Sequence, residues 1–335
     1  MNFDAIREQV EQGFISWQKH PSADLYILNY TQRAQYDWHW TPETMACRGL
    51  IVDGQNNIVS RPFLKFFSIE QRQEPLPLEP FEVYEKLDGS LGILYYAHGE
   101  PRIATRGSFV SEQAQWATYH LHEKYGHVKF DPTLTYLFEI IYPGNRIVVD
   151  YGDTADLFLL AVIDTETGKD VPLQDIGIPV VKRYDGIKDV AELSALEEAN
   201  KEGFVLKFES GLRVKVKFAE YKRLHRLLTG LNSKQIWECL KDGRGLNDVL
   251  ERVPDEFYNW VRATERDLVA AFKGIEDGCR AQFKDLGDRK ENALYYRTCE
   301  HPAVLFKMLD GQDYSDYIWK QVRPVAAMPF KIDEE

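Results

Sequence analysis

A lysine followed by a tight turn is the first feature of this sequence that could do covalent chemistry. Lys86 stands in the run Glu85-Lys86-Leu87-Asp88-Gly89-Ser90, at the end of an apolar stretch typical of a strand. A lysine amine becomes a useful nucleophile when burial or neighbouring cations lower its pKa, and a rigid position lets it meet a ligand phosphate. The tetrapeptide KLDG is short, and a strand end followed by a glycine turn is its plain structural alternative.

Two acids and two lysines follow in an order that suits a bound nucleotide. Glu139 lies inside an apolar run, where a carboxylate is costly to bury unless it accepts hydrogen bonds, and ribose hydroxyls would donate them. Glu202 begins a further strand-like run. Lys215 and Lys217 are two residues apart, so a strand would turn both to one face, where two cations suit a triphosphate. Taken singly, Glu139 also fits an edge-strand acid, and the two lysines a solvated strand face.

In this order, the pieces resemble the motifs of the covalent nucleotidyltransferase superfamily, which contains ATP-dependent DNA and RNA ligases and mRNA capping enzymes. The motifs span residues 86–217. Cys47-Arg48-Gly49-Leu50, the segment SRPFLKFF at 60–67 and the run FEIIYPGNRIVVDYGD at 138–153 narrow the resemblance to the bacteriophage T4 RNA ligase 1 family. It covers roughly residues 40–220.

The resemblance implies a role for each matching residue. Lys86 is similar to the lysine that accepts AMP, and Glu139 to the acid that contacts the nucleoside sugar. Glu202 resembles the acid associated with the catalytic metal, Mg²⁺ or Mn²⁺, and Lys215 and Lys217 resemble the lysines that contact the α-phosphate. The other residues expected to bind ATP are Arg48 and Lys65 at the β- and γ-phosphates, Asp88 and Gly89 in the nucleophile turn, and Phe67, Glu85, Arg106 and Val205.

One position departs from the superfamily pattern. In the strand-like run LFLLAVID at 157–164, many members place an aromatic residue just before the acid to stack on the base, and here that residue is Ile163. The stack is therefore expected from Phe67, or from apolar contacts by Phe204 and Val205. Discrimination of ATP from GTP does not follow from the sequence.

Composition limits the class of protein. A chain of 335 residues predicts two domains. A net charge of −12 argues against coating nucleic acid through bulk positive charge, so any RNA surface must be confined. No run approaches the ~20 apolar residues of a membrane span, and the N-terminal run lacks the apolar core of a signal peptide. The four cysteines, Cys47, Cys239, Cys279 and Cys299, show no CxxC spacing and are expected to be reduced thiols in a cytoplasmic protein, whether cellular or encoded by a virus.

Periodicity predicts an α+β fold of antiparallel sheets with flanking helices over residues 1–230. The resemblance implies that this part of the chain is a nucleotidyltransferase (adenylation) domain. A helix is expected over 3–18, with further helices over 111–125 and 188–200. The expected strands are 25–30, 49–52, 81–86, 91–96, 136–142, 146–150, 157–163 and 204–209, with turns at Asp53-Gly54, His98-Gly99 and Ser210-Gly211.

After residue 230 strand-like runs stop, so residues 231–335 are expected to form an all-helical second domain. Ser233 is expected to cap its first helix, and Pro254 to lie in the first turn of a long one. Further helices are expected over 290–309 and 313–321.

Two clusters invite a functional interpretation that their spacing does not favour. His120 and His122 are two apart in a predicted helix, so they face different directions and do not suit a shared metal. Lys222-Arg223-Leu224-His225-Arg226 fits an exposed helix face, or alternatively a contact with the RNA backbone.

The sequence thus predicts an ATP-dependent RNA ligase. Lys86 attacks the α-phosphorus of ATP, AMP passes to an RNA 5′-phosphate, and an RNA 3′-hydroxyl displaces AMP. The resemblance implies repair of broken RNA, tRNA above all, with single-stranded or loop ends as the substrate. The competing hypotheses are a DNA ligase, a capping guanylyltransferase, and a catalytically silent protein that binds RNA ends. No recognisable β-rich segment follows residue 217, where the first two usually carry an OB-like domain.

Overall fold

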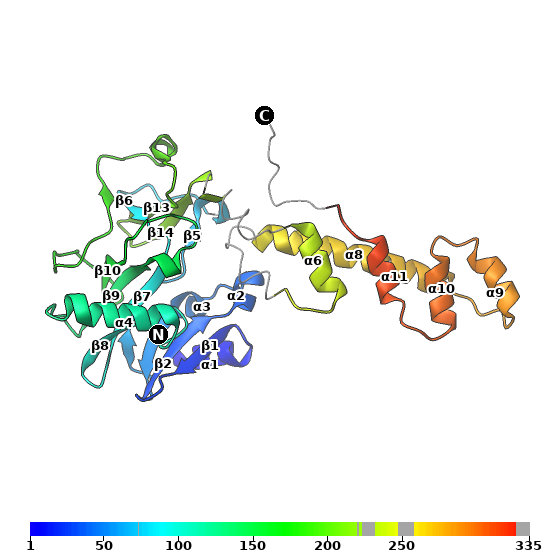
Figure 1. Ribbon diagram of the computed structural model, residues 1–335, viewed down its shortest axis with the longest axis horizontal. Helices are drawn as coiled ribbons and strands as arrows, with labels where there is room; N and C mark the ends of the chain where they lie inside the picture. Colours follow the sequence, from blue (N-terminus) through cyan, green and yellow to red (C-terminus); the bar gives the residue numbers. More distant parts are fainter. Residues whose placement is uncertain (73, 220, 223–231, 247–257, 326–335) are drawn as a thin grey trace. The chain divides into compact units, whose positions relative to one another are not determined.

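The computed structural model describes residues 1–72, 74–219, 221–222, 232–246 and 258–325 (Figure 1). The chain divides into two compact units, Met1–Leu228 and Thr229–Glu335. The first unit combines sheets with helices, and every regular element described in the second is a helix. The predicted α+β class with a helical C-terminal part is therefore confirmed. None of the described helices is long and apolar enough to cross a membrane.

Three sheets make up the described part of the first unit. Sheet A contains β1 (Ile15–Lys19), β2 (Leu25–Tyr30), β3 (Arg48–Asp53) and β4 (Ile58–Ser60). Sheet B contains, in spatial order, β12 (Arg183–Tyr184), β6 (Phe81–Lys86), β13 (Gly203–Phe208), β14 (Arg213–Lys217) and β5 (Phe67–Ser68). Sheet C contains β11 (Asp170–Val171), β10 (Asp156–Asp164), β9 (Leu134–Ile141), β7 (Ser90–Ala97) and β8 (Glu100–Ala104). All pairs of neighbouring strands are antiparallel except β14 with β5.

Alternation along the strands sorts their side chains into layers. In β7, Ile93 and Tyr95 pack with Ile27 and Ile51 of sheet A, whereas Leu94 faces the opposite way. That opposite face of sheet C is covered by α4 (Glu112–Tyr125), which is seen over the sheet in Figure 1. The outer face of sheet A is covered by α1 (Phe3–Glu11). Sheets A and C therefore form the packed body of the unit.

The helices and turns connecting these sheets are short. They are α2 (Gln32–Tyr36), α3 (Pro42–Ala46) and the 3₁₀ turns η1 (Ile69–Gln71), η2 (Pro143–Asn145) and η3 (Val190–Leu196). The three predicted hairpin turns are confirmed, since each joins two paired strands: β3 to β4, β7 to β8, and β13 to β14.

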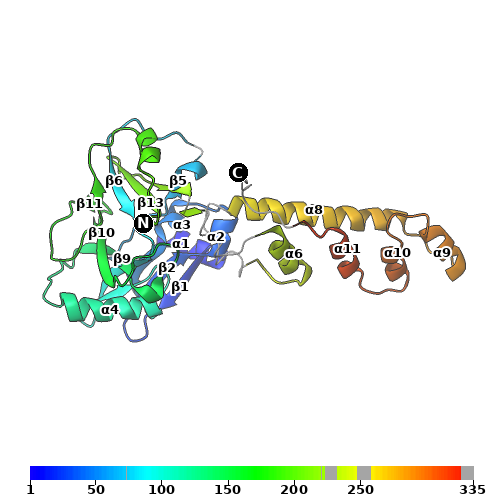
Figure 2. The same ribbon diagram turned by 45° about the horizontal axis from the view of Figure 1, so that its top comes forward.

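The second unit is arranged along one long helix, α8 (Tyr258–Gln282), with the shorter helices beside it (Figure 2). These are α6 (Ser233–Lys241), α9 (Arg289–Tyr296), α10 (Pro302–Leu309) and α11 (Ser315–Gln321). Cys279, Tyr296, Val304, Leu305 and Ile318 form its buried centre. The Trp237 indole N–H donates to the carbonyl of Trp319 at 2.8 Å, which ties α6 to α11.

Four local predictions were wrong, each for an identifiable reason. The helix expected over 3–18 ends at Glu11, because Gly13 takes a φ of 80° and the chain continues as β1. Residues 146–150 form no strand, since the amides of Val148 and Val149 bond to a side chain and not to a neighbouring strand. The interval 188–200 contains a 3₁₀ turn in place of an α-helix, and Asn232 rather than Ser233 caps α6. Pro254 lies outside the described residues.

Candidate active site

One face of sheet B gathers the chemically interesting residues in three rows that cross β6, β13 and β14. Strand pairing places them opposite one another as Lys86–Gly203–Lys217, Tyr84–Val205–Lys215 and Glu82–Lys207–Arg213. The alternate residues, among them Val83, Phe204, Leu206 and Val214, are buried on the opposite face. Period-two alternation therefore separates a hydrophobic side of the sheet from a charged one.

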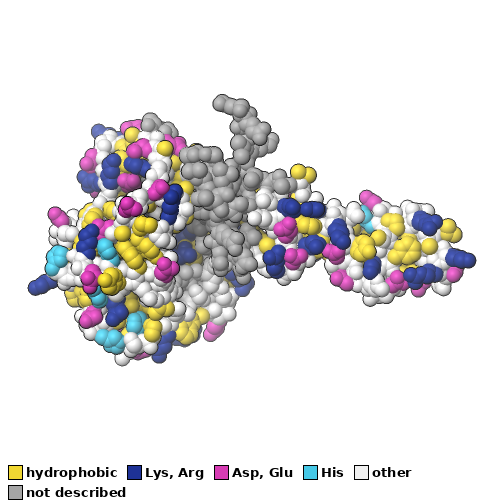
Figure 3. Space-filling model, viewed as in Figure 1, with side chains coloured by type: hydrophobic (Ala, Val, Ile, Leu, Met, Phe, Trp, Pro, Cys, Tyr) yellow, Lys and Arg dark blue, Asp and Glu magenta, His cyan; other side chains and the backbone are white. Residues whose placement is uncertain are grey.

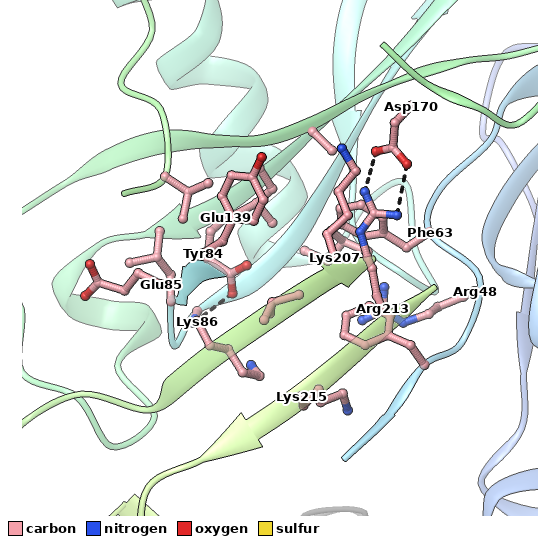
Figure 4. A pocket seen from close by; sticks show the side chains of 18 of the residues that line it. Arg48, Phe63, Tyr84, Glu85, Lys86, Glu139, Asp170, Lys207, Arg213 and Lys215 are labelled. Atoms are coloured by element: carbon pink, nitrogen blue, oxygen red, sulfur yellow. Dashed lines mark hydrogen bonds and ion pairs between the residues drawn. The ribbon is translucent and has the colours of Figure 1, made fainter. Parts of the chain in front are cut away.

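The charged face borders a cavity of about 990 Å³. Sheet C supplies the opposite wall through Ser90 and Leu91 of β7, Glu139 of β9 and Leu160 of β10. Figure 4 shows Lys86, Lys215 and Glu139 around this space, with Arg213 and Lys207 farther along the same wall. A cavity of this size is large enough to enclose a small ligand.

Lys86 ends β6 with its ammonium directed at a buried carboxylate. Its Nζ lies 2.7 Å from Oε2 of Glu202, whose side chain is 3% exposed, and Nζ of Lys217 lies 3.3 Å from Oε1 of the same group. A buried carboxylate is costly unless cations and hydrogen bonds compensate it, and here two lysines share it. The next residue, Gly203, has a φ of 145°, and a Cβ there would lie 2.0 Å from the carbonyl oxygen of Val216, so the turn into β13 requires glycine.

Asp88 holds the turn after Lys86 in place. The Asp88 carboxylate is buried and accepts hydrogen bonds from the amides of Val148 and Val149 at 2.8 and 2.9 Å and from the Tyr221 hydroxyl at 2.8 Å. Its own amide donates to the Tyr151 hydroxyl at 2.8 Å. Because segments distant in sequence converge on one side chain, the turn after Lys86 has a fixed position relative to the segment 148–151 and to Tyr221.

Glu139 faces the cavity beside that turn. The amide of Gly89 donates to its Oε1 at 2.9 Å, and a Cβ on Gly89 would lie 2.5 Å from the carbonyl oxygen of Ile140, so only glycine allows this approach. Burial raises the pKa of Glu139 to about 7, and the Lys86 ammonium opposes that rise. The carboxyl group therefore exchanges its proton near neutral pH, at a position where ligand hydroxyls could bond to it.

Most of the residues singled out in the sequence meet at this cavity. Arg48, Glu85, Lys86, Gly89, Arg106, Glu139, Val205 and Lys215 line it. Glu202 and Lys217 adjoin it through the ion pairs with Lys86, and Asp88 lies buried behind the turn. Ile163 is 3% exposed among residues of the core between sheets A and C, so it does not face the cavity.

Lys65 and Phe67 do not line this cavity, contrary to expectation. Alternation along the segment turns Phe66 into it instead, where Arg48 and Lys215 each lie 5.5 Å from the Phe66 ring centre. Lys65 and Phe67 border a second cavity of about 1080 Å³. Lys65 is buried, and its amino group lies 5.4 Å from the ring centre of Phe67. In this structure both residues therefore line the second cavity and not the one that Lys86 lines.

Several residues of the site were not identified from the sequence. Tyr84 lines the cavity because it lies two residues before Lys86 on the same strand face, a position that alternation predicts. Leu160 also lines it, at a break in the pairing of β9 with β10 between Leu159 and Ala161. Such bulges redirect side chains and leave no sequence signal of their own. Tyr151 and Tyr221 act through folding contacts that no local pattern predicts.

The two histidines of α4 serve structural contacts. His120 Nε2 lies 3.1 Å from Asp156 Oδ1, and His122 Nε2 lies 2.7 Å from the carbonyl oxygen of Pro101. Lys222 Nζ pairs with Glu70 Oε1 at 3.1 Å, and the remainder of its predicted basic cluster, 223–226, lies outside the described residues. Within the part of the chain that the structure describes, no three His, Cys, Asp or Glu side chains are grouped to hold a metal.

Sequence comparison identifies the family to which this geometry belongs. Residues 46–222, more than half of the chain, match the RNA ligase family of the T4 RNA ligase 1 type. The chain belongs to this RNA ligase family. The matched segment contains Arg48, Lys86, Glu139, Glu202, Lys215 and Lys217, and it ends just before the first unit does. The predicted family is confirmed.

Individual relatives have related names. A putative RNA ligase of Thermovibrio ammonificans is 30% identical over 231 residues, which cover 63% of this chain and 60% of that protein. A putative bifunctional polynucleotide kinase/RNA ligase of Autographa californica nuclear polyhedrosis virus is 27% identical over 235 residues, covering 61% of this chain and 34% of its relative. The match thus covers about three fifths of the first relative and about one third of the second. A solved structure of a putative ATP-dependent DNA ligase from Aquifex aeolicus aligns with 16% identity and a TM-score of 0.48, over 93% of this chain and 88% of that one.

Proposed function

We propose that this protein is an ATP-dependent RNA ligase that joins RNA 3′-hydroxyl and 5′-phosphate ends through a lysyl-AMP intermediate on Lys86. The observation that carries the proposal is the position of the Lys86 amine. It lies at the cavity wall, 2.7 Å from the Glu202 carboxylate and in the row of Lys217. A lysine so placed has an acceptor for its proton and cations for an incoming phosphate.

In the first step the neutral amine of Lys86 attacks the α-phosphorus of ATP. A P–N bond forms, the bond between the α- and β-phosphates breaks, and pyrophosphate leaves. Glu202 Oε2 is within reach of the proton that the amine releases. Lys215 and Lys217 neutralise charge that builds on the phosphate oxygens, and Arg48 and Arg106, which line the same cavity, suit the rest of the triphosphate.

The next two steps use RNA. A 5′-phosphate oxygen attacks the phosphorus of lysyl-AMP, the P–N bond breaks, and the amine of Lys86 is regenerated as the RNA becomes a 5′–5′ adenylylated strand. A 3′-hydroxyl then attacks the 5′-phosphorus, its proton is lost, and AMP leaves. When the P–N bond breaks, the departing nitrogen of Lys86 takes up a proton, and Glu202 Oε2 is within reach to return the one it accepted in the first step.

The nucleoside end of the cavity is apolar. Tyr84 and Val205 on sheet B face a wall that includes Leu160 and Val181. The side chains of Tyr84 and Leu160 also pack against the apolar cluster that contains Val181. A flat base fits against this aromatic and aliphatic surface. Glu139, beside the nucleophile turn, suits the ribose hydroxyls. This part of the proposal assigns base contact to Tyr84 and Val205 rather than to Phe67.

Mg²⁺ or Mn²⁺ is the proposed metal, with Glu202 as the protein group that would hold it. Magnesium commonly binds through one or two carboxylates together with substrate phosphates, so a single acid at the phosphate end fits. The metal would supply further neutralisation of phosphate charge.

The resemblance to RNA repair ligases extends the proposal to broken tRNA as the substrate. Residues 1–230 would form the adenylation domain, and residues 231–335 would contribute to the choice of substrate.

A sealing assay with four substrates tests this function. The full chain is incubated with Mg²⁺ and either ATP or GTP, and with either 5′-phosphorylated single-stranded RNA or nicked duplex DNA. We expect joined RNA with ATP, lost in Lys86→Ala and retained in Lys129→Ala, an exposed lysine elsewhere in the first unit. Dependence on GTP would instead indicate a capping guanylyltransferase, and preferential sealing of nicked DNA would indicate a DNA ligase. Binding of RNA ends without any reaction would indicate a catalytically silent protein.

A further inference from the structure

A second cavity adjoins the proposed nucleotide site. The two cavities share lining residues Phe63, Phe66, Asp170, Lys207 and Arg213, so they meet at one wall. In that wall Arg213 forms an ion pair with Asp170 and lies 4.4 Å from the centre of the Phe63 ring, as Figure 4 shows. A strand bound in the second cavity would therefore adjoin the space that Lys86 lines.

The charge of the second cavity is opposite to that of the protein. Its lining has six cations and three carboxylates, which gives a net charge of +3, whereas the whole chain carries −12. The six are Arg61, Lys65, Arg72, Lys169, Lys207 and Arg213, and the three are Glu74, Asp170 and Glu209. On the face shown in Figure 3, basic and acidic side chains of the described residues are intermixed. Positive charge is thus concentrated where a confined polyanion site would need it.

Aromatic rings line another part of this cavity. The ring of Phe67 lies 5.1 Å from that of Trp38 and 5.4 Å from that of Trp40. Trp38 follows α2 with a φ of 54°, a conformation uncommon for a bulky residue, and both tryptophans are partly exposed. The Lys65 amino group lies 5.1 Å from the Trp40 ring centre, so it stabilises this cluster through a cation–π contact.

From this arrangement we infer that the second cavity binds an unpaired segment of the RNA substrate adjacent to its reacting end. Aromatic platforms together with a cationic groove are how proteins hold single strands, since bases stack on the rings while cations follow the phosphates. A cavity of about 1080 Å³ admits a few unpaired nucleotides and no duplex. The inference rests on the proposed function in one respect only, namely that the bound strand is the one to be joined.

Binding of a labelled strand tests the inference without any chemistry. A fluorescent 5′-phosphorylated single-stranded RNA is titrated with the full chain, in the absence of ATP, at several salt concentrations. The variants are Trp38→Ala, and Lys169→Ala at an exposed position. The matched controls are Trp17→Ala, at a tryptophan that is 56% exposed on β1, and Lys129→Ala.

We expect Trp38→Ala to raise the Kd about tenfold through the loss of a stacked base. Lys169→Ala should reduce the slope of log Kd against log salt by about one, since one phosphate contact is removed. Both variants should still form lysyl-AMP at the wild-type rate. Affinities and slopes equal to those of the controls would overturn the inference, and Lys169→Ala decides it even if Trp38→Ala misfolds. Absence of lysyl-AMP in the wild type would instead overturn the proposed function while leaving the binding result intact.

Discussion

The Nζ atom of Lys86 lies 2.7 Å from Oε2 of Glu202. Lys86 is the last residue of β6, and Glu202 immediately precedes β13, the strand that pairs with β6. This contact joins a lysine side chain that is 21% exposed to a glutamate side chain that is 3% exposed. Lys217 approaches the other oxygen at 3.3 Å, so removing Glu202 would leave two ammonium groups facing each other. We therefore expect both the proposed chemistry and the local structure to depend on this acid.

Replacing Glu202 by Gln keeps its shape and removes its charge. We expect the rate of lysyl-AMP formation to fall about 100-fold or more, since a proton acceptor is lost. The measurement is single-turnover transfer of label from ATP, with circular dichroism to show that the variant is folded. Glu198→Gln, at an acid 51% exposed in the same segment, is the matched control. An unfolded Glu202→Gln would make the residue structural.

Tyr221 is predicted to position the nucleophile turn. The change Tyr221→Phe removes the 2.8 Å hydrogen bond to Oδ1 of Asp88, and the loss of a hydrogen bond to a charged acceptor costs about 1.5–3 kcal/mol. The rate constant for lysyl-AMP formation should fall about tenfold with little change in the KM for ATP, because the turn shifts while the binding surface remains. Tyr96→Phe, which removes a hydroxyl bond to the Phe130 carbonyl, should affect stability alone. A rate equal to that of Tyr96→Phe would contradict the positioning role.

The raised pKa of Glu139 predicts how stability depends on pH. Burial raises the pKa of this carboxyl group from 4.5 to about 7 in the folded state, so the folded protein binds its proton more tightly than the unfolded chain does. Stability should therefore fall as pH rises from about 4.5 through about 7 and then level off. Glu139→Gln should not lose stability over this pH range. Above about pH 7 the free energy of unfolding of the variant should therefore exceed that of the wild type, by at most about 3 kcal/mol because the cavity admits water. Urea unfolding midpoints of the wild type and of Glu139→Gln, measured from about pH 4 to pH 8, test this prediction. Parallel curves of midpoint against pH would contradict the raised pKa of Glu139.

Base contact by Tyr84 is tested by removing its ring. Tyr84→Leu should raise the KM for ATP about tenfold, a typical effect of losing one aromatic contact with a base, whereas Tyr84→Phe should retain the wild-type value. Phe81→Leu, on the opposite face of β6 against Phe208, controls for a general disturbance of the strand. An unchanged KM in Tyr84→Leu would place the base elsewhere in the cavity.

Alternation explains which parts of the site could be predicted. Lys215 and Lys217 were expected to share a strand face, and they do, with Lys86 in the same row as Lys217. The same rule applied two residues before Lys86 would have identified Tyr84. Lys65 and Phe67 were assigned by resemblance, which carries no information on the direction of a side chain, and they line the second cavity.

Long-range contacts explain what could not be predicted. The run 146–150 has the composition of a strand, yet its amides are taken by the carboxylate of Asp88, which is 60 residues away from Val148 in sequence. Residues 15–19 satisfy both a helical and an alternating pattern, and pairing with β2 selects the strand. In each case a partner distant in sequence decides between two locally acceptable conformations.

The identity of the residue that accepts AMP tests the proposed chemistry most directly. The full chain should be incubated with ATP and Mg²⁺, digested under conditions that preserve the P–N bond, and mapped by peptide mass spectrometry. We predict a single AMP adduct on Lys86, absent from Lys86→Arg and present in Lys129→Ala. An adduct on Lys215, Lys217 or any other residue, or a protein that seals RNA with no covalent adduct, would contradict the central claim.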